Sequence, residues 1–356
     1  TLLRVAGEFA LPVPPLALPD TGEGQHRDDL LQSPAVRLFV QRCQAVNPAL
    51  DLSGASTEQI AEICQRVDGV PLAIELAAAR VTHLSLEGLR ERLERRLPLL
   101  TGGGRDRPLR LQTMRGAIAW SHDLLSVEEQ VLFRRLAVFA AGCTLEAAEA
   151  IASDGADGAI GNHSVLDLVA ALVEASLLRS EGGQDGVLRY RMLETIREFA
   201  GEHLHASGER AVVQQRHAAW FTGLAEHYAL AELLPDGNRA RMILEAEHPN
   251  LRAALAWYAE SKQPQTLLRL AASLGQFWAG LGYYHEGREW LERGLRSLET
   301  SPADRAEALV ALGVLHLYLG AYREAATNLE QGLADCQAAG NALHGTLALI
   351  ALGALA

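Results

Sequence analysis

Apolar residues recur every three or four positions along most of this 356-residue chain, which is the spacing of an amphipathic helix. Four such runs follow one another between residues 33 and 104, and polar residues or prolines suited to helix starts precede them. Ser33 and Pro34, for example, stand at the cap and first helical positions of SPAVRLFVQRCQAV. The pattern therefore predicts a small helical domain over residues 33–104.

The residues before this domain lack the helical pattern. The stretch FALPVPPLALPD contains four prolines between Pro12 and Pro19, which exclude a helix interior. The polar stretch DTGEGQHRDD follows and is typical of an exposed loop. We expect residues 1–32 to form an extended lead-in segment.

A glycine-rich break, TGGGRDRP, precedes a second helical region over residues 105–206. Ser126 and Ser164 are each followed three positions later by an acidic residue, which indicates helix starts. The period then changes, because SLLRS and VLRYRML flank the turn EGGQDG, a β-hairpin signal. The helical stretch LETIREFAGEHLHA closes the region. Helices followed by a short hairpin predict a winged-helix domain.

Residues 207–356 are helical in pattern and repeat themselves. LGYYHEGREWLERGL (281–295) aligns with LGAYREAATNLEQGL (319–333) at an offset of 38, with eight identities in fifteen positions. Two helices with one apolar stripe each cannot bury those stripes alone, so such units stack. The spacing resembles tetratricopeptide repeats, which implies an α–α superhelical array that binds a protein or a small effector.

Composition agrees with a mainly α fold, because 49% of residues are hydrophobic, only 5% are aromatic, and alanine and leucine abound. The formal net charge of −12 argues against nucleic acid as the main partner, since phosphate-binding proteins usually present a basic face. No apolar run has transmembrane length and no signal peptide is recognisable. These features predict a cytoplasmic protein without membrane contact.

Cysteine spacing gives no sign of a metal site. None of the four cysteines lies within three residues of another, and they form no cluster with histidines. We expect buried free thiols in a reducing compartment. The cysteines are Cys43, Cys64, Cys143 and Cys336.

The sharpest local motif is DGVPLAIELAAAR, residues 68–80. By itself it is typical of an ordinary helix start. Gly69 permits the turn, Pro71 suits the first helical position, and Asp68 places an acid near the helix N-terminus. A second interpretation, one wall of a nucleotide pocket, depends on the strings around it.

Three strings occur in an order that resembles a known family: GVPLAIELAAAR, LQTMRGAIAWSHDLLSVEEQVLFRRLAVFAAGCTLEAAEA and RYRMLETIREFA. Together they resemble the signal-transduction ATPases with numerous domains (STAND, NB-ARC-like), in the bacterial transcriptional-regulator branch of LuxR/AfsR-like type. The resemblance covers most of the chain. It implies a P-loop core, a helical (ARC1-like) domain, a winged helix and a sensor array.

The resemblance implies a nucleotide site. The family's Gly-x-Pro-Leu turn lies over the bound nucleotide with the proline near the adenine, which places Gly69, Pro71 and Leu72 at an ATP or ADP pocket. The rigid, apolar edge of a proline suits that position.

The family's Met-His-Asp motif, whose histidine reaches the nucleotide phosphates, falls here on Met192, Leu193 and Glu194. A leucine cannot hydrogen-bond a phosphate, so that contact is lost, while Glu194 keeps the acidic position as a cofactor-binding candidate. The alternative is that Met192 belongs to the core and that Glu194 is a solvated charge at a helix N-terminus.

No phosphate-binding loop of the form G-x-x-x-x-G-K-[ST] occurs, because the only lysine, Lys262, follows no glycine run. We therefore expect no catalysis by this chain alone and no catalytic or metal-binding residues. The resemblance implies a parent protein that carries the ATPase core and can oligomerise. The first residue, Thr1, and the apolar helical pattern at the end suggest the interior of a longer protein.

The candidate recognition helix, SVLDLVAALVEAS, contains no arginine or lysine, so we expect no direct contact with nucleic acid. The sequence predicts the regulatory and sensor portion of an ATP/ADP-switched protein that controls transcription. The alternative is a protein–protein interaction scaffold with a degenerate nucleotide module.

Overall fold

The computed structural model describes residues 13–19, 27–46, 56–103, 108–152, 160, 164–183, 186–229, 237–297 and 301–355. Most of these residues are helical, and the strands among them form one two-stranded sheet, which confirms a mainly α fold with a short hairpin. Two compact units divide the chain. The first comprises Thr1–Ala137, Ala152–Glu181 and Tyr190–Arg210, and the second comprises Val138–Ile151, Gly182–Arg189 and Ala211–Ala356.

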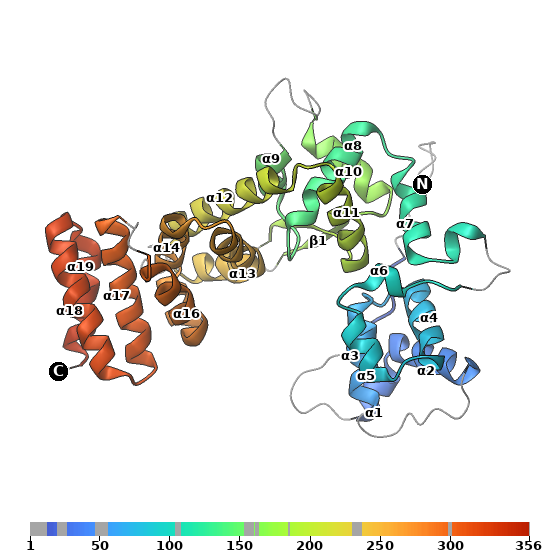
Figure 1. Ribbon diagram of the computed structural model, residues 1–356, viewed down its shortest axis with the longest axis horizontal. Coiled ribbons are helices and arrows are strands. Elements are labelled where there is room, and N and C mark those ends of the chain that lie inside the picture. The colour runs from blue at the N-terminus through green and yellow to red at the C-terminus, as the bar shows by residue number, and fades with distance from the viewer. Residues whose placement is uncertain are drawn as a thin grey trace. The chain divides into compact units, whose positions relative to one another are not determined.

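The first unit contains the predicted helical domain and most of the winged-helix region (Figure 1). Its helices are α1 (Arg27–Gln32), α2 (Pro34–Val46), α3 (Ser56–Arg66), α4 (Pro71–Ala79), α5 (Leu86–Arg92), α6 (Arg96–Leu99), α7 (Met114–His122), α8 (Val127–Arg135), α10 (Val165–Glu174) and α11 (Glu194–Ala206). Short 3-10 turns are η1 (Arg80–Thr82), η2 (Leu109–Leu111) and η3 (Leu136–Val138).

The helical domain is built around the apolar faces of its helices. α2 packs against α3 and α4, and α3 packs against α5. Their facing side chains Phe39, Ile60, Ile74 and Leu89 are fully buried. Burial of these stripes is what makes short helices stable in water.

The described part of the lead-in, residues 13–19, is extended and is held onto this domain. The Leu16 N–H donates to the Gly69 carbonyl at 3.0 Å, and the Ser33 hydroxyl donates to the Ala17 carbonyl at 2.8 Å. The last residues of the predicted lead-in are helical instead, because they form α1.

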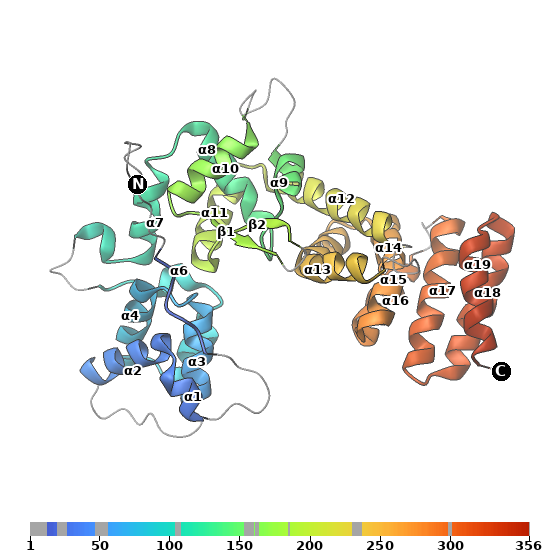
Figure 2. The same ribbon diagram turned by 180° about the vertical axis from the view of Figure 1, so that it is seen from behind.

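The predicted helix starts of the winged-helix region are confirmed. The Ser126 hydroxyl accepts from the Glu129 N–H at 3.2 Å, and the Glu129 carboxylate accepts from the Ser126 N–H at 2.8 Å, which is a complete capping box. The predicted hairpin is also present, with strands β1 (Arg179–Gly182) and β2 (Leu188–Arg191) paired (Figure 2).

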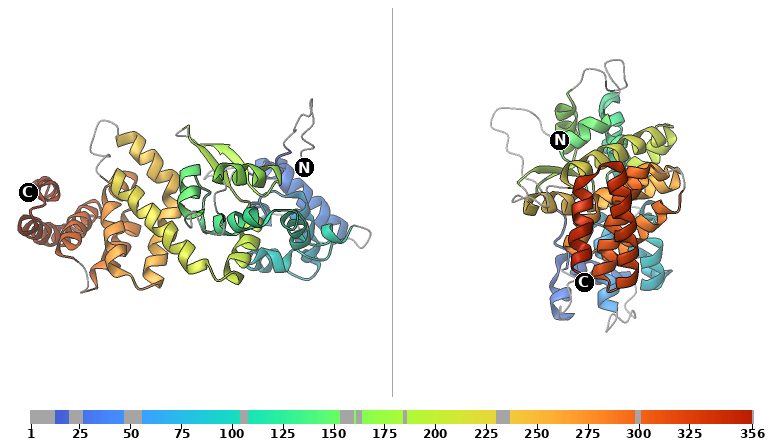
Figure 3. Two further views of the ribbon diagram at one scale, coloured as in Figure 1. Left: turned by 90° about the horizontal axis from the view of Figure 1, so that it is seen from above. Right: turned by 90° about the vertical axis from the view of Figure 1, so that its left-hand side faces the viewer.

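The second unit contains the repeat region. Its helices are α9 (Leu145–Ala152), α12 (Arg210–Tyr228), α13 (Gly237–Glu260), α14 (Pro264–Ser273), α15 (Gly275–Leu281), α16 (Tyr284–Leu295), α17 (Pro302–Tyr318), α18 (Tyr322–Ala339) and α19 (Ala342–Gly353). From α16 onward each helix packs beside the next, and α17, α18 and α19 stand side by side in the right-hand view of Figure 3.

The offset of 38 in the sequence corresponds to repeated geometry. Gly282 and Gly320 lie at equivalent helix ends with φ of 82° and 74°, the left-handed region that glycine adopts readily. A Cβ atom at Gly294 would lie 2.8 Å from Leu268, and one at Gly332 would lie 2.9 Å from Val310. The repeated glycines therefore end helices and permit close helix packing, which confirms a helical repeat region.

A buried polar cluster in the second unit fastens α13 to the preceding chain. The Asn250 side chain is fully buried; its carbonyl accepts from the Ala140 N–H at 2.8 Å, and its amide donates to the Gly142 carbonyl at 3.0 Å. The same amide donates to Glu247 at 2.7 Å, and the other oxygen of Glu247 accepts from Arg189 at 2.6 Å. Every polar atom of the Asn250 side chain is thus occupied, as burial demands.

Candidate functional site

The candidate turn joins α3 to α4. Asp68 and Gly69 have φ of 55° and 64°, and the Gly69 N–H donates to the Cys64 carbonyl at 3.1 Å. This bond satisfies a carbonyl group at the end of α3. Gly69 is required here, because a Cβ atom would overlap the Leu16 carbonyl oxygen. The turn is therefore rigid and closely packed against the extended segment.

Pro71 begins α4. Val70 precedes it with φ −70° and ψ 118°, an extended conformation that suits the residue before a proline. Beyond the first turn, α4 is largely buried. The interpretation of this stretch as an ordinary helix start thus holds for the helix itself.

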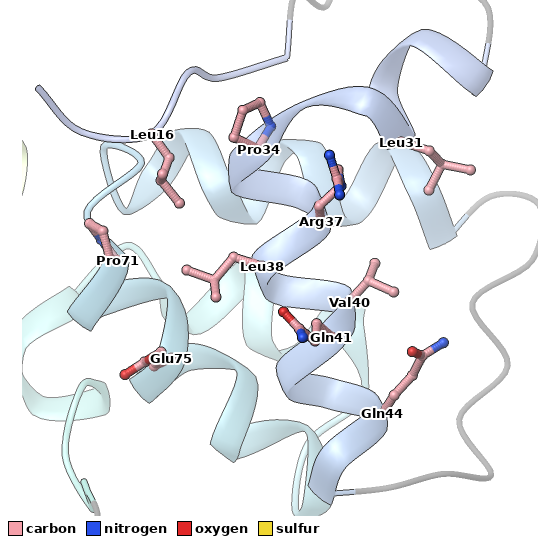
Figure 4. A pocket seen from close by; sticks show the side chains of 10 residues that line it. All are labelled: Leu16, Leu31, Pro34, Arg37, Leu38, Val40, Gln41, Gln44, Pro71 and Glu75. Atoms are coloured by element: carbon pink, nitrogen blue, oxygen red, sulfur yellow. The ribbon is translucent and has the colours of Figure 1, made fainter.

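A cavity of about 630 Å³ lies beside Pro71 (Figure 4). Leu16, Leu38 and Pro71 gather at one end of it, from the extended segment, α2 and α4. Its polar lining comes mostly from α2. The lining residues are Leu16, Leu31, Pro34, Arg37, Leu38, Val40, Gln41, Gln44, Pro71 and Glu75.

The charges around this cavity are partly paired. Glu75 accepts from Arg42 at 2.7 Å, and the Glu75 side chain is largely shielded from water. Arg37, Gln41 and Gln44 have exposed side chains along α2. An apolar end with donors and acceptors along one side suits a flat, polar-edged ligand.

Of the four predicted site residues, Pro71 lines this cavity, whereas Gly69, Leu72 and Glu194 do not. Leu72 is half-buried in the first turn of α4 and does not line the cavity. Glu194 begins α11 and forms ion pairs with Arg96 at 3.3 Å and with Arg197. The structure thus places one of the four residues, Pro71, at the cavity and Gly69 in the turn that precedes it, and a nucleotide role for any of the four residues stays a prediction.

The environment of Glu194 keeps its carboxylate ionised. Burial, the largest effect, raises its pKa, but hydrogen bonds from Arg197 and the charges of Arg197, Arg96 and Arg191 together lower the pKa below its usual value. Met192, two positions earlier, is buried in the core. Leu193 between them is extended and offers α11 no side-chain cap.

Asp68 has a role that the sequence did not indicate. Its carboxylate accepts from the N–H groups of Glu194 and Thr195 at 2.8 and 3.4 Å, so it caps α11 rather than α4. Burial raises the pKa of Asp68, and those two N–H bonds only partly oppose the increase. The one sequence signal was indirect, since an apolar Leu193 leaves the start of α11 without its own cap.

The described residues contain no cluster of three or more histidine, cysteine or acidic side chains that is placed to hold a metal ion. The four cysteines are buried free thiols, as predicted. No described helix combines the length and the apolar character needed to cross a bilayer.

Comparison with known proteins shows what this chain is similar to. Residues 125–205 match the family of winged helix-turn-helix domains, which confirms the predicted winged helix. Proteins named "Putative HTH-type transcriptional regulator" from Mycobacterium tuberculosis and Mycobacterium bovis are each 37% identical to this chain over 362 residues. The match covers 99% of this chain and 39% of theirs, so the chain spans about two fifths of the length of these relatives.

Two further proteins are similar to parts of the chain. An uncharacterized Mycobacterium tuberculosis protein is 36% identical over 215 residues, which is 60% of this chain and 51% of its own. A crystal structure of a STAND protein with a tetratricopeptide repeat sensor from Pyrococcus horikoshii aligns with 93% of this chain and 57% of its own. That alignment has 13% identity and a TM-score of 0.25, a likeness too small to carry an argument.

Proposed function

We propose that this chain is the regulatory and sensor portion of a nucleotide-switched transcriptional regulator of the STAND, NB-ARC-like class, in the LuxR/AfsR-like branch. The winged helix-turn-helix match and the regulator names of relatives that align with 99% of the chain support a regulatory role. The observation that carries the nucleotide role is the position of Pro71, which ends the Gly69 turn and forms one wall of the cavity.

The cavity suits an adenine base in three respects. Its volume of about 630 Å³ lies within the range of about 300–1,000 Å³ common for small-molecule sites. Leu16, Leu38 and Pro71 supply an apolar surface, and Gln41 supplies both a donor and an acceptor on the side of α2. The turn behind Pro71 is fixed by hydrogen bonds, so the surface keeps its shape when empty.

In this proposal, the phosphates of ATP or ADP are held by a P-loop core elsewhere in a longer protein. In this scheme the chain responds to whether ATP or ADP is bound, and it does not hydrolyse ATP by itself. The second unit binds a protein or small effector on its repeats and thereby biases the switch, which requires contacts that differ between two states. Oligomerisation of the longer protein is compatible with this scheme.

The test is nucleotide binding by a protein that joins the ATPase core to this chain. A fluorescent ADP analogue is titrated into the wild type, Pro71→Ala and the control Pro302→Ala. Both prolines occupy the first turn of a helix, but only Pro71 lines the cavity. Loss of the proline surface costs about 1 kcal/mol, so Pro71→Ala should weaken binding about fivefold while Pro302→Ala changes little.

Two results would contradict the proposal. Equal affinities of Pro71→Ala and Pro302→Ala for the ADP analogue would show that this turn does not contact the nucleotide. No nucleotide binding by the joined protein would favour the alternative, a protein–protein scaffold with a degenerate nucleotide module.

Direct DNA binding is a second candidate function, because a winged helix-turn-helix domain is matched and relatives bear regulator names. We nevertheless propose that this piece does not contact DNA. α10 carries no basic residue and contains Asp167 and Glu174, so it would repel phosphates. Fluorescence anisotropy with duplex DNA decides the matter, since sequence-dependent binding that survives physiological salt would establish the second candidate.

A further inference from the structure

We propose that Asp68 is a positioning residue that couples the Gly69–Pro71 turn to α11 of the winged helix. The coupling rests on the proposed function in one respect, namely that a nucleotide is what acts on the turn. The geometric half, a cap supplied to α11 from another domain segment, stands on the contacts alone.

The first turn of α11 depends on Asp68 for its N–H partners. The first N–H groups of any helix lack partners within the helix and are usually satisfied by the side chain just before it. That position is Leu193, which has no polar side-chain atom. The Asp68 carboxylate accepts from the N–H of Glu194 at 2.8 Å and of Thr195 at 3.4 Å instead.

The backbone of one tight turn joins Asp68 to Pro71, which lines the proposed nucleotide cavity. It has φ 55°, its neighbour Gly69 has φ 64°, and the Gly69 carbonyl accepts from Leu16 at the apolar end of the cavity. A ligand that shifts Pro71 or Leu16 therefore shifts the backbone that carries Asp68. Because hydrogen bonds weaken steeply with distance and angle, a small shift releases the α11 N–H groups.

A second set of contacts restrains the same end of α11. Arg96 donates from its side chain to the Arg66 carbonyl at 2.5 Å and forms the 3.3 Å ion pair with Glu194. The backbone N–H of Arg96 donates to Glu198 at 2.8 Å. These contacts hold α11 near the end of α3 when the cap is released. The first turn of α11 therefore changes while α11 stays attached to the helical domain.

Four proteins provide the test: the wild type, Asp68→Ala, Asp68→Asn and Ser85→Ala. Ser85 is the matched control, because its hydroxyl caps α5 of the same domain by accepting from the Gly88 N–H and, among the described residues, forms no hydrogen bond with α11. Asp68→Asn keeps one acceptor oxygen and guards against a general folding defect in the alanine variant. The measurement is hydrogen exchange of the backbone amides of residues 194–198.

In this chain, Asp68→Ala should raise exchange at 194–198 about five- to tenfold, Asp68→Asn less, and Ser85→Ala not at all. Unchanged exchange in Asp68→Ala, or an equal increase in Ser85→Ala, would overturn the inference. Either result is independent of nucleotide.

In the protein that includes the ATPase core, saturating ADP should change exchange at 194–198 in the wild type and in Ser85→Ala but not in Asp68→Ala. If ADP binds and Pro71→Ala weakens it, yet exchange at 194–198 ignores ADP in the wild type, the coupling is wrong while the proposed function stands. If ADP does not bind, the proposed function fails and the coupling fails with it, while the capping result in this chain remains.

Discussion

The carboxylate of Asp68 accepts a hydrogen bond at 2.8 Å from the backbone N–H of Glu194, 126 positions further along the chain. The start of the last helix of the winged-helix region is thus fixed by the turn between α3 and α4. This bond joins the residue just before GVPLAIELAAAR to RYRMLETIREFA, two of the strings from which the family resemblance was inferred. It also shows that the turn at Gly69 has a structural task besides any ligand contact.

The Gly69 turn should tolerate no side chain. In Gly69→Ala the new Cβ atom overlaps the Leu16 carbonyl oxygen, and φ of 64° is itself unfavourable for alanine by about 1 kcal/mol. We expect a loss of about 2–4 kcal/mol in the free energy of unfolding of the first unit, since the extended segment must move away. Urea denaturation followed by circular dichroism measures it.

Gly208→Ala is the control, because Gly208 has φ 76° but a Cβ atom there would have no neighbour within 4 Å among the described residues. It should show only the backbone cost of about 1 kcal/mol. Equal losses in the two variants would mean that Leu16 does not press on Gly69.

Asn250 should be among the costliest amides to remove. Asn250→Ala leaves the Ala140 N–H and the Gly142 carbonyl buried without their partner, which costs about 2–4 kcal/mol for the pair. Asn328→Ala is the control, because Asn328 is only half-buried and bonds to one side chain, His316. Thermal unfolding gives the loss, and faster amide exchange at 140–142 should locate it.

The second unit should lose stability below neutral pH through His217. Burial, the largest effect, lowers the pKa of this histidine from 6.5 to about 4, and its bond with Asn250 opposes the change only in part. The unfolded chain therefore binds the proton first, so the free energy of unfolding falls as the pH drops from about 6.5 to about 4. The full loss is about 3 kcal/mol.

His217→Phe isolates this effect, since phenylalanine keeps the ring packing against Phe139 and Phe221 and cannot take up a proton. Urea midpoints measured between pH 7 and pH 4 should show a smaller decline in the variant than in the wild type. Parallel declines would exclude His217 as the titrating group.

Two glycines in helices should respond to alanine with opposite signs. A Cβ atom at Gly287 in α16 would lie 2.6 Å from the Trp278 ring and 2.7 Å from Leu315, so Gly287→Ala should destabilise by about 1–3 kcal/mol. A Cβ atom at Gly223 in α12 would have no described atom within 4 Å, so Gly223→Ala should stabilise by about 1 kcal/mol. Melting temperatures that move in the same direction would contradict this packing.

Features determined by neighbours in sequence were predictable. The caps at Ser126 and Ser164 depend on residues three positions away, and both are present. The repeat was readable because Gly282 and Gly320 perform the same task in consecutive units. Local hydrogen bonding and periodic packing leave a direct trace in the order of residues.

Features determined by distant residues were not predictable. Asp68 looked like an acid at the start of α4, and nothing near it in the sequence names Glu194 as its partner. The side of the cavity formed by Arg37 and Gln41 depends on how α2 packs against α4, which no local pattern specifies. Asn250 likewise belongs to a helix whose pattern is ordinary, and its importance comes from residues 140–142.

The two units are not consecutive stretches of chain. Residues 138–151 and 182–189 belong to the second unit although first-unit residues flank both, so the chain passes between the units five times, at 138, 152, 182, 190 and 211. No single protease cut therefore yields two intact halves. For the same reason, recombination could not exchange the repeat array alone. Residues 138–151 and 182–189 of the winged-helix region belong to the same unit and would have to be exchanged with it.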